Sequence, residues 1–311
     1  MRKRTAGLLL SVAAAISVSL SSCGSSPAST PAPSSGAAVG GRIKVSVTFD
    51  AMKEFTEAVG GEKVDISKII PDGTEPHDFE PKAQDLVALS SAKVFVYSGL
   101  GMESWAAAAV KSAGNSGLIV AEASKGVEPI KNTDPGEVKQ HGQYDPHIWL
   151  SLKGAEIETK NIRDALVQAD PSNRAYYEKN CNDFILQLEK IYQEYDRKFR
   201  STAQKSFVTG HAAFAYLCRD FGLQQDSVED VFAEGEPSAQ QLAQLVGYCR
   251  GNRVTTVFAE EMTSPEVSKT LADEVGAKVE TIYTIESSED NKNYLERMES
   301  NLSKIYASLK D

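Results

Sequence analysis

The sequence predicts an α/β fold with two lobes, each built on a mainly parallel sheet flanked by helices. Segments rich in β-branched residues alternate with segments of helical periodicity, and this alternation occurs in two successive series. Alternating strands and helices with short connections are typical of parallel sheets covered on both faces. One unbroken helical pattern lies between the two series, which predicts a helix that bridges the lobes.

The first series fills residues 42–150, the predicted N-terminal lobe. Its strand-like runs, such as IKVSVTF and KVFVYSG, are dominated by β-branched and aromatic residues. The polar stretch VEPIKNTDPGEVKQHGQYDP, within residues 126–146, has no periodicity and predicts a loop. In this lobe we expect strands at residues 43–49, 64–70, 93–99 and 117–124, and helices near residues 51–58, 82–92 and 102–114.

Residues 151–170 form the predicted linking helix, which ends at the Asp170-Pro171 step, and residues 171–311 form the predicted C-terminal lobe. Ser238 and Gln241 show the capping-box pattern of a helix N-terminus. In this lobe we expect strands at residues 205–211, 226–232, 253–260 and 278–285, and helices at residues 175–200, 212–222, 238–251, 264–276 and 293–310.

Residues 1–22 resemble a bacterial lipoprotein signal peptide. MRKR gives a positive start, and the apolar run GLLLSVAAAISVSL is shorter than the roughly 20 residues of a membrane-spanning helix. The run ends in LSSCG, so Cys23 is expected to become a lipidated N-terminus; the alternative is an ordinary secretory signal with an incidental cysteine. Residues 23–41, rich in Ser, Pro, Ala and Gly, should form a flexible tether. We therefore expect an extracytoplasmic protein that the lipid on Cys23 anchors to the bacterial cell membrane.

The charge of the chain bears on its partners, and its cysteines bear on disulfide bonds. The chain has 33 basic and 43 acidic side chains, a net charge of −10, which argues against a nucleic-acid partner. The cysteines that follow the signal peptide and Cys23 are Cys181, Cys218 and Cys249. An exported chain can pair two of them, but the sequence alone does not fix any disulfide.

Four polar residues that are far apart in the sequence suggest a metal site: His77, His147, His211 and Glu286. Three of them follow predicted strands, where open parallel sheets place their ligand crevice. Since each lobe contributes two, a ligand held by all four would lie in the cleft between the lobes. Three imidazoles and one carboxylate suit tetrahedral Zn²⁺, and four protein donors leave no open position, which fits carriage better than hydrolysis. The long gaps are not a metal-ligand spacing, however, and a lone histidine after a strand is often structural.

Several motifs that occur in order over residues 43–310 resemble the cluster A-I metal-binding lipoproteins, the solute-binding subunits of zinc and manganese ABC importers. The resemblance implies two α/β lobes joined by a single long rigid helix, with the metal bound between the lobes. It also implies a partner, the membrane permease of an ABC importer. The motifs that carry it are GTEPHDFEPKAQDL, YSGLGMESW, DPHIWLSLKGA, DPSNRAYYEKN, TGHAAFAYLCRDFGL, EGEPSAQQLAQL and NLSKI.

The same resemblance implies which residues bind the metal. By motif, the ligands fall on His77, His147, His211 and, after the last predicted strand, Glu286. Many relatives have an Asp-Ser step where this chain reads YTIESSED, so Glu289 and Asp290 are alternative candidates for the fourth ligand.

The residue at position 211 bears on the choice of metal. Manganese-binding relatives usually have glutamate there, and imidazole favours zinc over manganese. His211 therefore indicates Zn²⁺ as the bound and transported ion, with Mn²⁺ or Fe²⁺ as the alternative cargo. Zinc-binding relatives often have a histidine-rich loop before the second ligand, whereas the loop in this chain contains only His141.

The leading functional prediction is a monomeric binding protein, not an enzyme, that delivers Zn²⁺ to an importer. A zinc hydrolase is a rival class, but the sequence has no HExxH motif and no Ser/His/Asp set that would support it. A surface adhesin is the third possibility, because a lipid anchor and a tether fit that role equally well.

Overall fold

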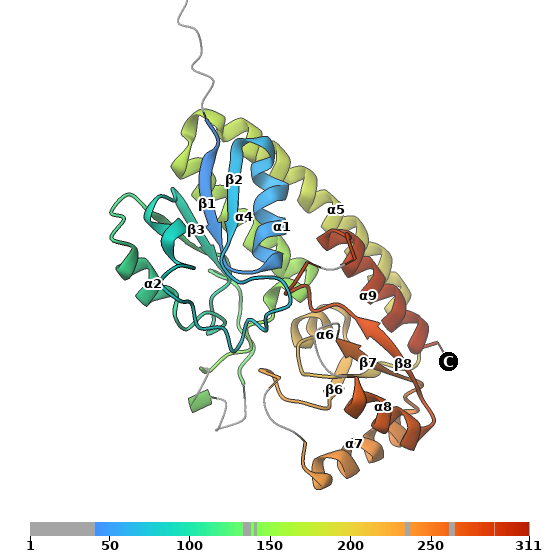
Figure 1. The fold of residues 1–311 in the computed structure, drawn as a ribbon. Helices are drawn as coiled ribbons and strands as arrows, with labels where there is room; N and C mark the ends of the chain where they lie inside the picture. The colour runs from blue at the N-terminus through green and yellow to red at the C-terminus, as the bar shows by residue number, and fades with distance from the viewer. Residues whose placement is uncertain are drawn as a thin grey trace, which may run out of the picture. The chain divides into compact units, whose positions relative to one another are not determined.

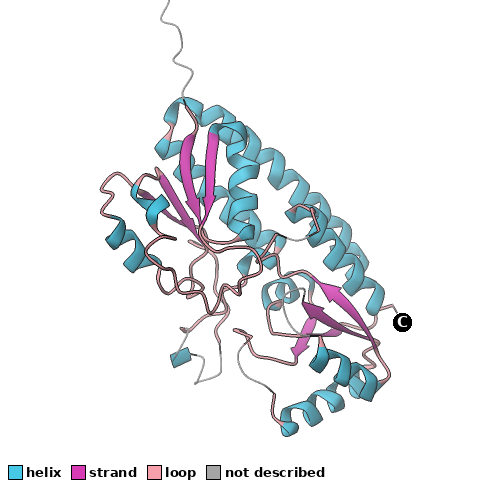
Figure 2. Ribbon diagram, in the orientation of Figure 1, coloured by secondary structure: helices cyan, strands magenta, loops and turns pink. Residues whose placement is uncertain are grey.

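Two four-stranded parallel sheets organise the computed structural model, which describes residues 41–132, 138–139, 142–233, 237–260, 265–288 and 290–310. The first sheet has the order β2-β1-β3-β4 and the second the order β6-β5-β7-β8, so both have the same topology (Figures 1 and 2). We call each sheet with its covering helices a half of the molecule. The strands are β1 (Ile43–Val47), β2 (Val64–Lys68), β3 (Val94–Tyr97), β4 (Ile119–Glu122), β5 (Ser206–Thr209), β6 (Gln224–Ser227), β7 (Thr256–Glu260) and β8 (Lys278–Ile282).

Each sheet reverses its winding direction at its second strand in spatial order, between β1 and β3 and between β5 and β7. Open parallel sheets bind ligands beyond the carboxyl ends of the strands at such switch points. The predicted α/β class with two parallel sheets flanked by helices is confirmed, and the loops at the carboxyl ends of the strands are where a site is expected.

The helices mostly follow the predicted periodicity. Ser238 and Gln241 form the predicted capping box, and Asn293 and Glu296 form a second one. The Ser151 hydroxyl accepts a hydrogen bond from Gly154 N and so caps the helix that follows the second histidine. The helices are α1 (Asp50–Gly60), α2 (Ala106–Ala113), α4 (Leu152–Ala169), α5 (Arg174–Arg200), α6 (Ala215–Phe221), α7 (Ala239–Asn252), α8 (Glu266–Val275) and α9 (Tyr294–Ser308).

Helix α5 packs against both halves. With 27 residues it is about 40 Å long. Near its start, Asn180 Nδ2 donates to Val59 O of α1 at 3.0 Å; further along, Tyr195 Oη donates to Glu299 O of α9 at 3.4 Å. Helix α4 has the bounds expected of the linking helix, but α5 also joins the halves, so the domain limits at residues 150 and 171 stay a prediction.

A single apolar cluster joins the two halves. It contains Val47 and Val96 of the first sheet, Phe207 and Phe258 of the second, and a stripe along α5. Burial of this shared surface stabilises the two halves against each other by the hydrophobic effect. Cys181, Cys218 and Cys249 are buried free thiols, so the structure forms no disulfide among these three described residues.

Two predicted elements are wrong. Residues 82–92 form turns and a short 3-10 helix (Val87–Ser90) instead of an α-helix; the Ser90 hydroxyl donates to Val87 O at 2.8 Å and so competes with helical bonding. The strand expected at residues 226–232 lies earlier, at Gln224–Ser227, because it pairs with β5, which ends at Thr209. β6, with the sequence QQDS, is a polar edge strand without the β-branched residues that mark the other strands.

Some predictions concern residues that the structure does not describe: the signal peptide 1–22, most of the tether, Cys23, His141 and Glu289. In the part of the chain that it does describe, we find no helix with the length and apolar character needed to cross a membrane.

Candidate metal centre

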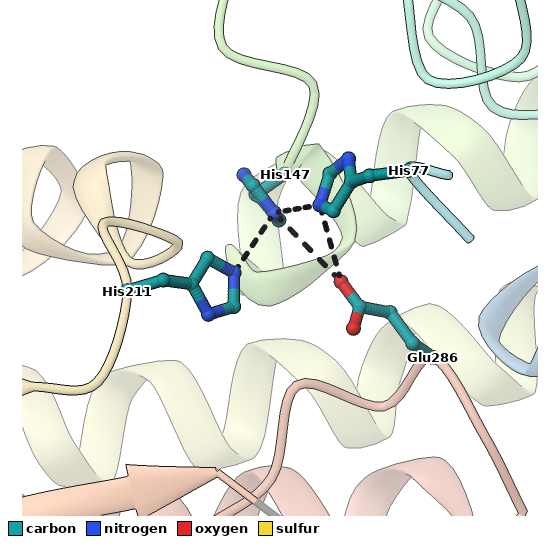
Figure 3. A group of neighbouring side chains, drawn as sticks. All are labelled: His77, His147, His211 and Glu286. Atoms are coloured by element: carbon teal, nitrogen blue, oxygen red, sulfur yellow. Dashed lines mark hydrogen bonds and ion pairs between the residues drawn. The ribbon is translucent and has the colours of Figure 1, made fainter. Parts of the chain in front are cut away.

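Four side chains meet between the two sheets (Figure 3). His77 lies in the loop after β2, His147 directly before the 3-10 helix Ile148–Leu150, His211 after β5 and Glu286 after β8. One nitrogen or oxygen of each lies within 4.8 Å of the others. The structure thus brings together all four residues that the sequence suggested as ligands.

The distances show how the donor atoms face one another. His147 Nε2 lies 3.1 Å from His77 Nε2 and 3.3 Å from His211 Nε2. Glu286 Oε1 lies 3.8 Å from His77 Nε2 and 3.7 Å from His147 Nε2. Such convergence of nitrogen lone pairs and a carboxylate oxygen is the arrangement that a metal ion with nitrogen and oxygen ligands requires.

A carboxylate orients His147. Asp145 Oδ1 lies 2.9 Å from His147 Nδ1 and also accepts the His147 backbone N–H at 2.9 Å. When Nδ1 carries the proton that Asp145 accepts, Nε2 presents its lone pair to the other three side chains. The Tyr216 hydroxyl donates to Asp145 O at 2.7 Å, so helix α6 holds this loop in place.

A second carboxylate orients His211. Glu260 Oε1, at the end of β7, accepts the His211 backbone N–H at 3.1 Å and lies 3.6 Å from His211 Nδ1. Gly210 permits this approach, because a Cβ at that position would lie 1.8 Å from Glu260 Oε2. The position of Glu260 thus depends on the glycine beside His211.

The electrostatics of the two histidines differ. Burial, followed by the charge of His211, holds the pKa of His147 well below its usual value. Burial also opposes protonation of His211, but the nearby carboxylate of Glu260, with the charges of Glu286 and Glu75, outweighs it and raises the pKa of His211 to about 9. Before metal binds, a proton is therefore favoured on His211 and disfavoured on His147.

Aromatic rings enclose the centre on two sides. The Trp149 ring lies 5.2 Å from the His147 ring, and the Phe232 ring lies 5.4 Å from the His77 ring in an edge-on arrangement. Trp149 is fixed by a hydrogen bond of 2.7 Å from Nε1 to Thr284 O, next to the loop of Glu286. The four donor side chains are almost fully buried, and low exposure to water strengthens electrostatic interactions at the donor atoms.

The structure also separates Asp290, one of the two alternative candidates, from the cluster. The Asp290 carboxylate is bound instead to the Tyr283 hydroxyl, at 2.5 Å, and to Lys292, so Asp290 does not join the four donors. Sequence reasoning did not identify Asp145 or Phe232. Asp145 had one signal, its place two residues before His147 in the DPHIWL motif; Phe232 had none.

Fold and site together define the class: an α/β protein whose two parallel sheets enclose donor atoms suited to a metal ion. A family model described as zinc-uptake complex component A, periplasmic (ZnuA), matches residues 45–308, and the chain belongs to this family. Members of this family are thus described as components of a zinc-uptake complex, and the resemblance noted from the motifs is confirmed.

Individual relatives agree with this assignment. The chain is 45% identical over 273 residues to a putative metal-binding protein of Treponema pallidum (strain Nichols), covering 85% of this chain and 86% of that one. It is 36% identical over 326 residues to the high-affinity zinc uptake system protein ZnuA of Bacillus subtilis (strain 168), covering 99% of both. A zinc-bound crystal structure of a ZnuA deletion mutant superposes with a TM-score of 0.77 at 32% identity, covering 87% of this chain and 99% of the other.

Proposed function

We propose that this chain captures Zn²⁺ outside the cytoplasmic membrane and delivers it to the membrane permease of an ABC importer. The ion binds to His77, His147, His211 and Glu286. The observation that carries the proposal is the convergence of three imidazole nitrogens and one carboxylate oxygen within 4.8 Å of one another, in a site with almost no solvent exposure.

The donor set supports zinc over the alternative cargo. Zn²⁺ accepts tetrahedral nitrogen and oxygen ligands, whereas Mn²⁺ prefers oxygen donors and higher coordination numbers. Asp145 and Glu260 add the carboxylate–histidine pairing that fixes the orientation of metal-binding imidazoles. Four protein donors also leave no position for a reactive metal-bound water, which supports carriage over hydrolysis.

The proposed cellular arrangement depends on the N-terminus. A lipid on Cys23 and the tether of residues 23–41 would hold a monomer close to the membrane that contains the permease. Membership in the zinc-uptake family supports the permease as partner. Mass spectrometry of the protein extracted from membranes tests the anchor, because a diacylated or triacylated Cys23 gives a defined mass increase.

Zinc titration of site variants tests the metal site. The double variant His77→Ala/His147→Ala removes two donors and should abolish high-affinity binding in competition with a chromophoric chelator. Glu286→Gln should weaken binding, whereas Asp290→Asn, a matched change in the same loop outside the cluster, should not. Unchanged zinc affinity in the double-histidine variant would refute the proposed site.

Metal identity needs a separate measurement. Elemental analysis of protein purified without added metal should find zinc, and Zn²⁺ should displace Mn²⁺ in direct competition. Preferential retention of manganese would replace zinc by the alternative cargo without changing the proposed site.

A further inference from the structure

The loop that carries Glu286 follows a strand of the second sheet, but its contacts reach the first half of the molecule. The backbone N–H of Asp50, the first residue of α1, donates to Glu286 O at 3.2 Å. The backbone N–H of Gly73 donates to the Ser287 hydroxyl at 2.8 Å. Gly73 lies in the loop that carries His77, so the loops of the first and fourth proposed ligands are directly connected.

Arg297 of α9 also contributes to this connection. Its guanidinium donates through Nη1 to Ser287 O at 2.7 Å and through Nη2 to Asp50 Oδ2 at 2.5 Å. Glu54 Oε1 is a third, longer contact of Nη2, at 3.4 Å. Arg297 and Asp50 have no solvent exposure. Arg297 thus binds the Ser287 carbonyl of the Glu286 loop directly. It also binds the carboxylate of Asp50, whose backbone N–H donates to the Glu286 carbonyl.

The backbone next to Glu286 needs such support. Ile285 has a φ of 60°, in the left-handed region that β-branched residues rarely adopt. It is fully buried, so solvent cannot relax the loop. Strained backbone of this kind persists only when surrounding contacts fix it, and it occurs preferentially at functional sites. The contacts of Arg297 and Asp50 are two that fix this loop.

A purely stabilising role does not explain a buried arginine here. Apolar residues of similar volume often stabilise a protein as well as a buried ion pair does. Arginine differs in its planar group, whose separate N–H donors bind a carbonyl and a carboxylate in fixed directions, which lysine cannot reproduce.

We propose that Arg297 is a positioning residue for the Glu286 carboxylate: by holding the Ser287 carbonyl and Asp50, it sets the loop conformation that directs Glu286 towards the three histidines. The proposal rests on the proposed function, in which Glu286 is the fourth zinc ligand. It assigns to α9 a part in placing a ligand that α9 does not itself carry.

The test is a double-mutant cycle on the full-length chain. Arg297→Lys keeps a positive charge beside Asp50 but loses the donor to Ser287 O, and should weaken Zn²⁺ binding by about tenfold, the lower end for partners that orient metal ligands. In a Glu286→Gln background the same change should alter zinc affinity by less than about twofold, because the oriented carboxylate is already absent. With Co²⁺ in place of Zn²⁺, the absorption spectrum of Arg297→Lys should shift towards that of Glu286→Gln.

Controls separate positioning from stability. Arg250→Lys makes the same chemical change in an exposed ion pair with Glu274, 2.9 Å apart on α7 and α8, and should leave zinc affinity and the Co²⁺ spectrum unchanged. If Arg297→Lys does not fold, Asp50→Asn/Arg297→Gln replaces the buried ion pair by a neutral amide pair and enters the same cycle.

Two results would overturn the proposal: an affinity loss of equal size in both backgrounds, which indicates a general structural role, or no loss in the native background. Failure of the proposed function looks different. In that case His77→Ala/His147→Ala keeps its zinc affinity, whatever the result for Arg297.

Discussion

The carboxyl edges of the two sheets share a topology and differ in chemistry. In the first sheet, the buried carboxylate of Glu103 accepts the backbone N–H groups of Ser98 and Gly99, at 2.9 and 3.0 Å, at the end of β3. In the second sheet, the buried carboxylate of Glu260 accepts the backbone N–H of His211 at 3.1 Å, just after β5. At both switch points, a buried carboxylate thus accepts hydrogen bonds from the backbone.

The partner of each carboxylate makes the difference. Beside Glu103 lies a second buried acid, Glu158, whose pKa is raised well above the usual value by burial and then by the charge of Glu103. Beside Glu260 lies His211, whose Nε2 faces the other donors of the metal centre. At edges of the same topology, the residue type thus differs: a second carboxyl group neighbours Glu103, and an imidazole neighbours Glu260.

Removal of His211 should have the largest effect. Structural zinc sites have binding free energies of about 10–16 kcal/mol, so each of four donors accounts for about 3 kcal/mol, or a hundredfold in affinity. We expect His211→Ala to weaken zinc binding by about that factor in chelator competition. Glu158→Gln, at the matching edge of the first sheet, should change zinc affinity by less than about twofold. Comparable losses in both variants would contradict the assignment of the site to His211 and the three donors around it.

The orientation of His211 by Glu260 should have a smaller effect. Loss of a carboxylate that orients a metal-bound histidine typically costs about 10- to 100-fold in affinity, so Glu260→Gln should fall in that range. Gly210→Ala should reproduce the loss, because its Cβ would lie 1.8 Å from Glu260 Oε2 and displace the carboxylate. Gly251→Ala, on α7 with open space around the added Cβ, is the matched control for folding and binding. Normal zinc affinity in Gly210→Ala would show that Glu260 does not orient His211.

Zinc binding should release a proton from His211. The pKa of His211 is raised to about 9, so its ring carries a proton at neutral pH before metal binds, and zinc must replace that proton. One released proton makes the affinity rise about tenfold per pH unit up to about pH 9, above which His211 is already neutral. Calorimetry at pH 7 in buffers of different ionisation enthalpy counts the released protons. Glu260→Gln should lower the count, and no proton release by the native chain would refute the raised pKa.

The sequence predicted most of the fold because its core strands are short apolar runs of β-branched residues, which remain recognisable without tertiary information. β6 was misplaced because the edge strand Gln224–Ser227 is polar, and residues 82–92 were misassigned because serine hydroxyls bond the local backbone in place of a helix. In both places a local pairing, absent from any periodic pattern, determined the structure.

The site shows the same division. The four converging side chains were predicted from motifs, since each motif places a donor just outside a strand or helix. Their supporting contacts were not, because they join residues far apart in the sequence: Arg297 and Asp50 are separated by 247 positions. Glu260 approaches His211 only because position 210 lacks a Cβ. The candidate ligands are thus readable from local sequence, whereas their orientation depends on the packing of the two halves.

The smallest effect is expected at the carboxyl edge of the first sheet, where Glu158 and Glu103 lie. Among the described residues, Glu158 Oε2 has no hydrogen-bond partner, and such a buried polar group costs about 1–3 kcal/mol. Because the folded pKa of Glu158 is raised, the native state keeps a proton that the unfolded chain loses above about pH 4.5, so native stability falls as pH rises from there. Glu158→Gln is always neutral and avoids this fall. Its Tm should match that of the native chain near pH 4 and exceed it by about 2–4 °C at pH 7.5.

Glu103→Gln is the matched control at the same edge. Glu103 accepts hydrogen bonds from Thr48, Ser98 and Gly99, at 2.7, 2.9 and 3.0 Å. The NH₂ group of a glutamine would face these donors and could not accept their hydrogen bonds, so the substitution should lower the Tm. Opposite effects of the same substitution at two neighbouring carboxyls would show that Glu158 holds the proton and Glu103 the charge. If instead Glu158→Gln lowered the Tm equally at pH 4 and pH 7.5, the folded protein would not keep a proton on Glu158, and the comparison with the candidate metal centre would fail.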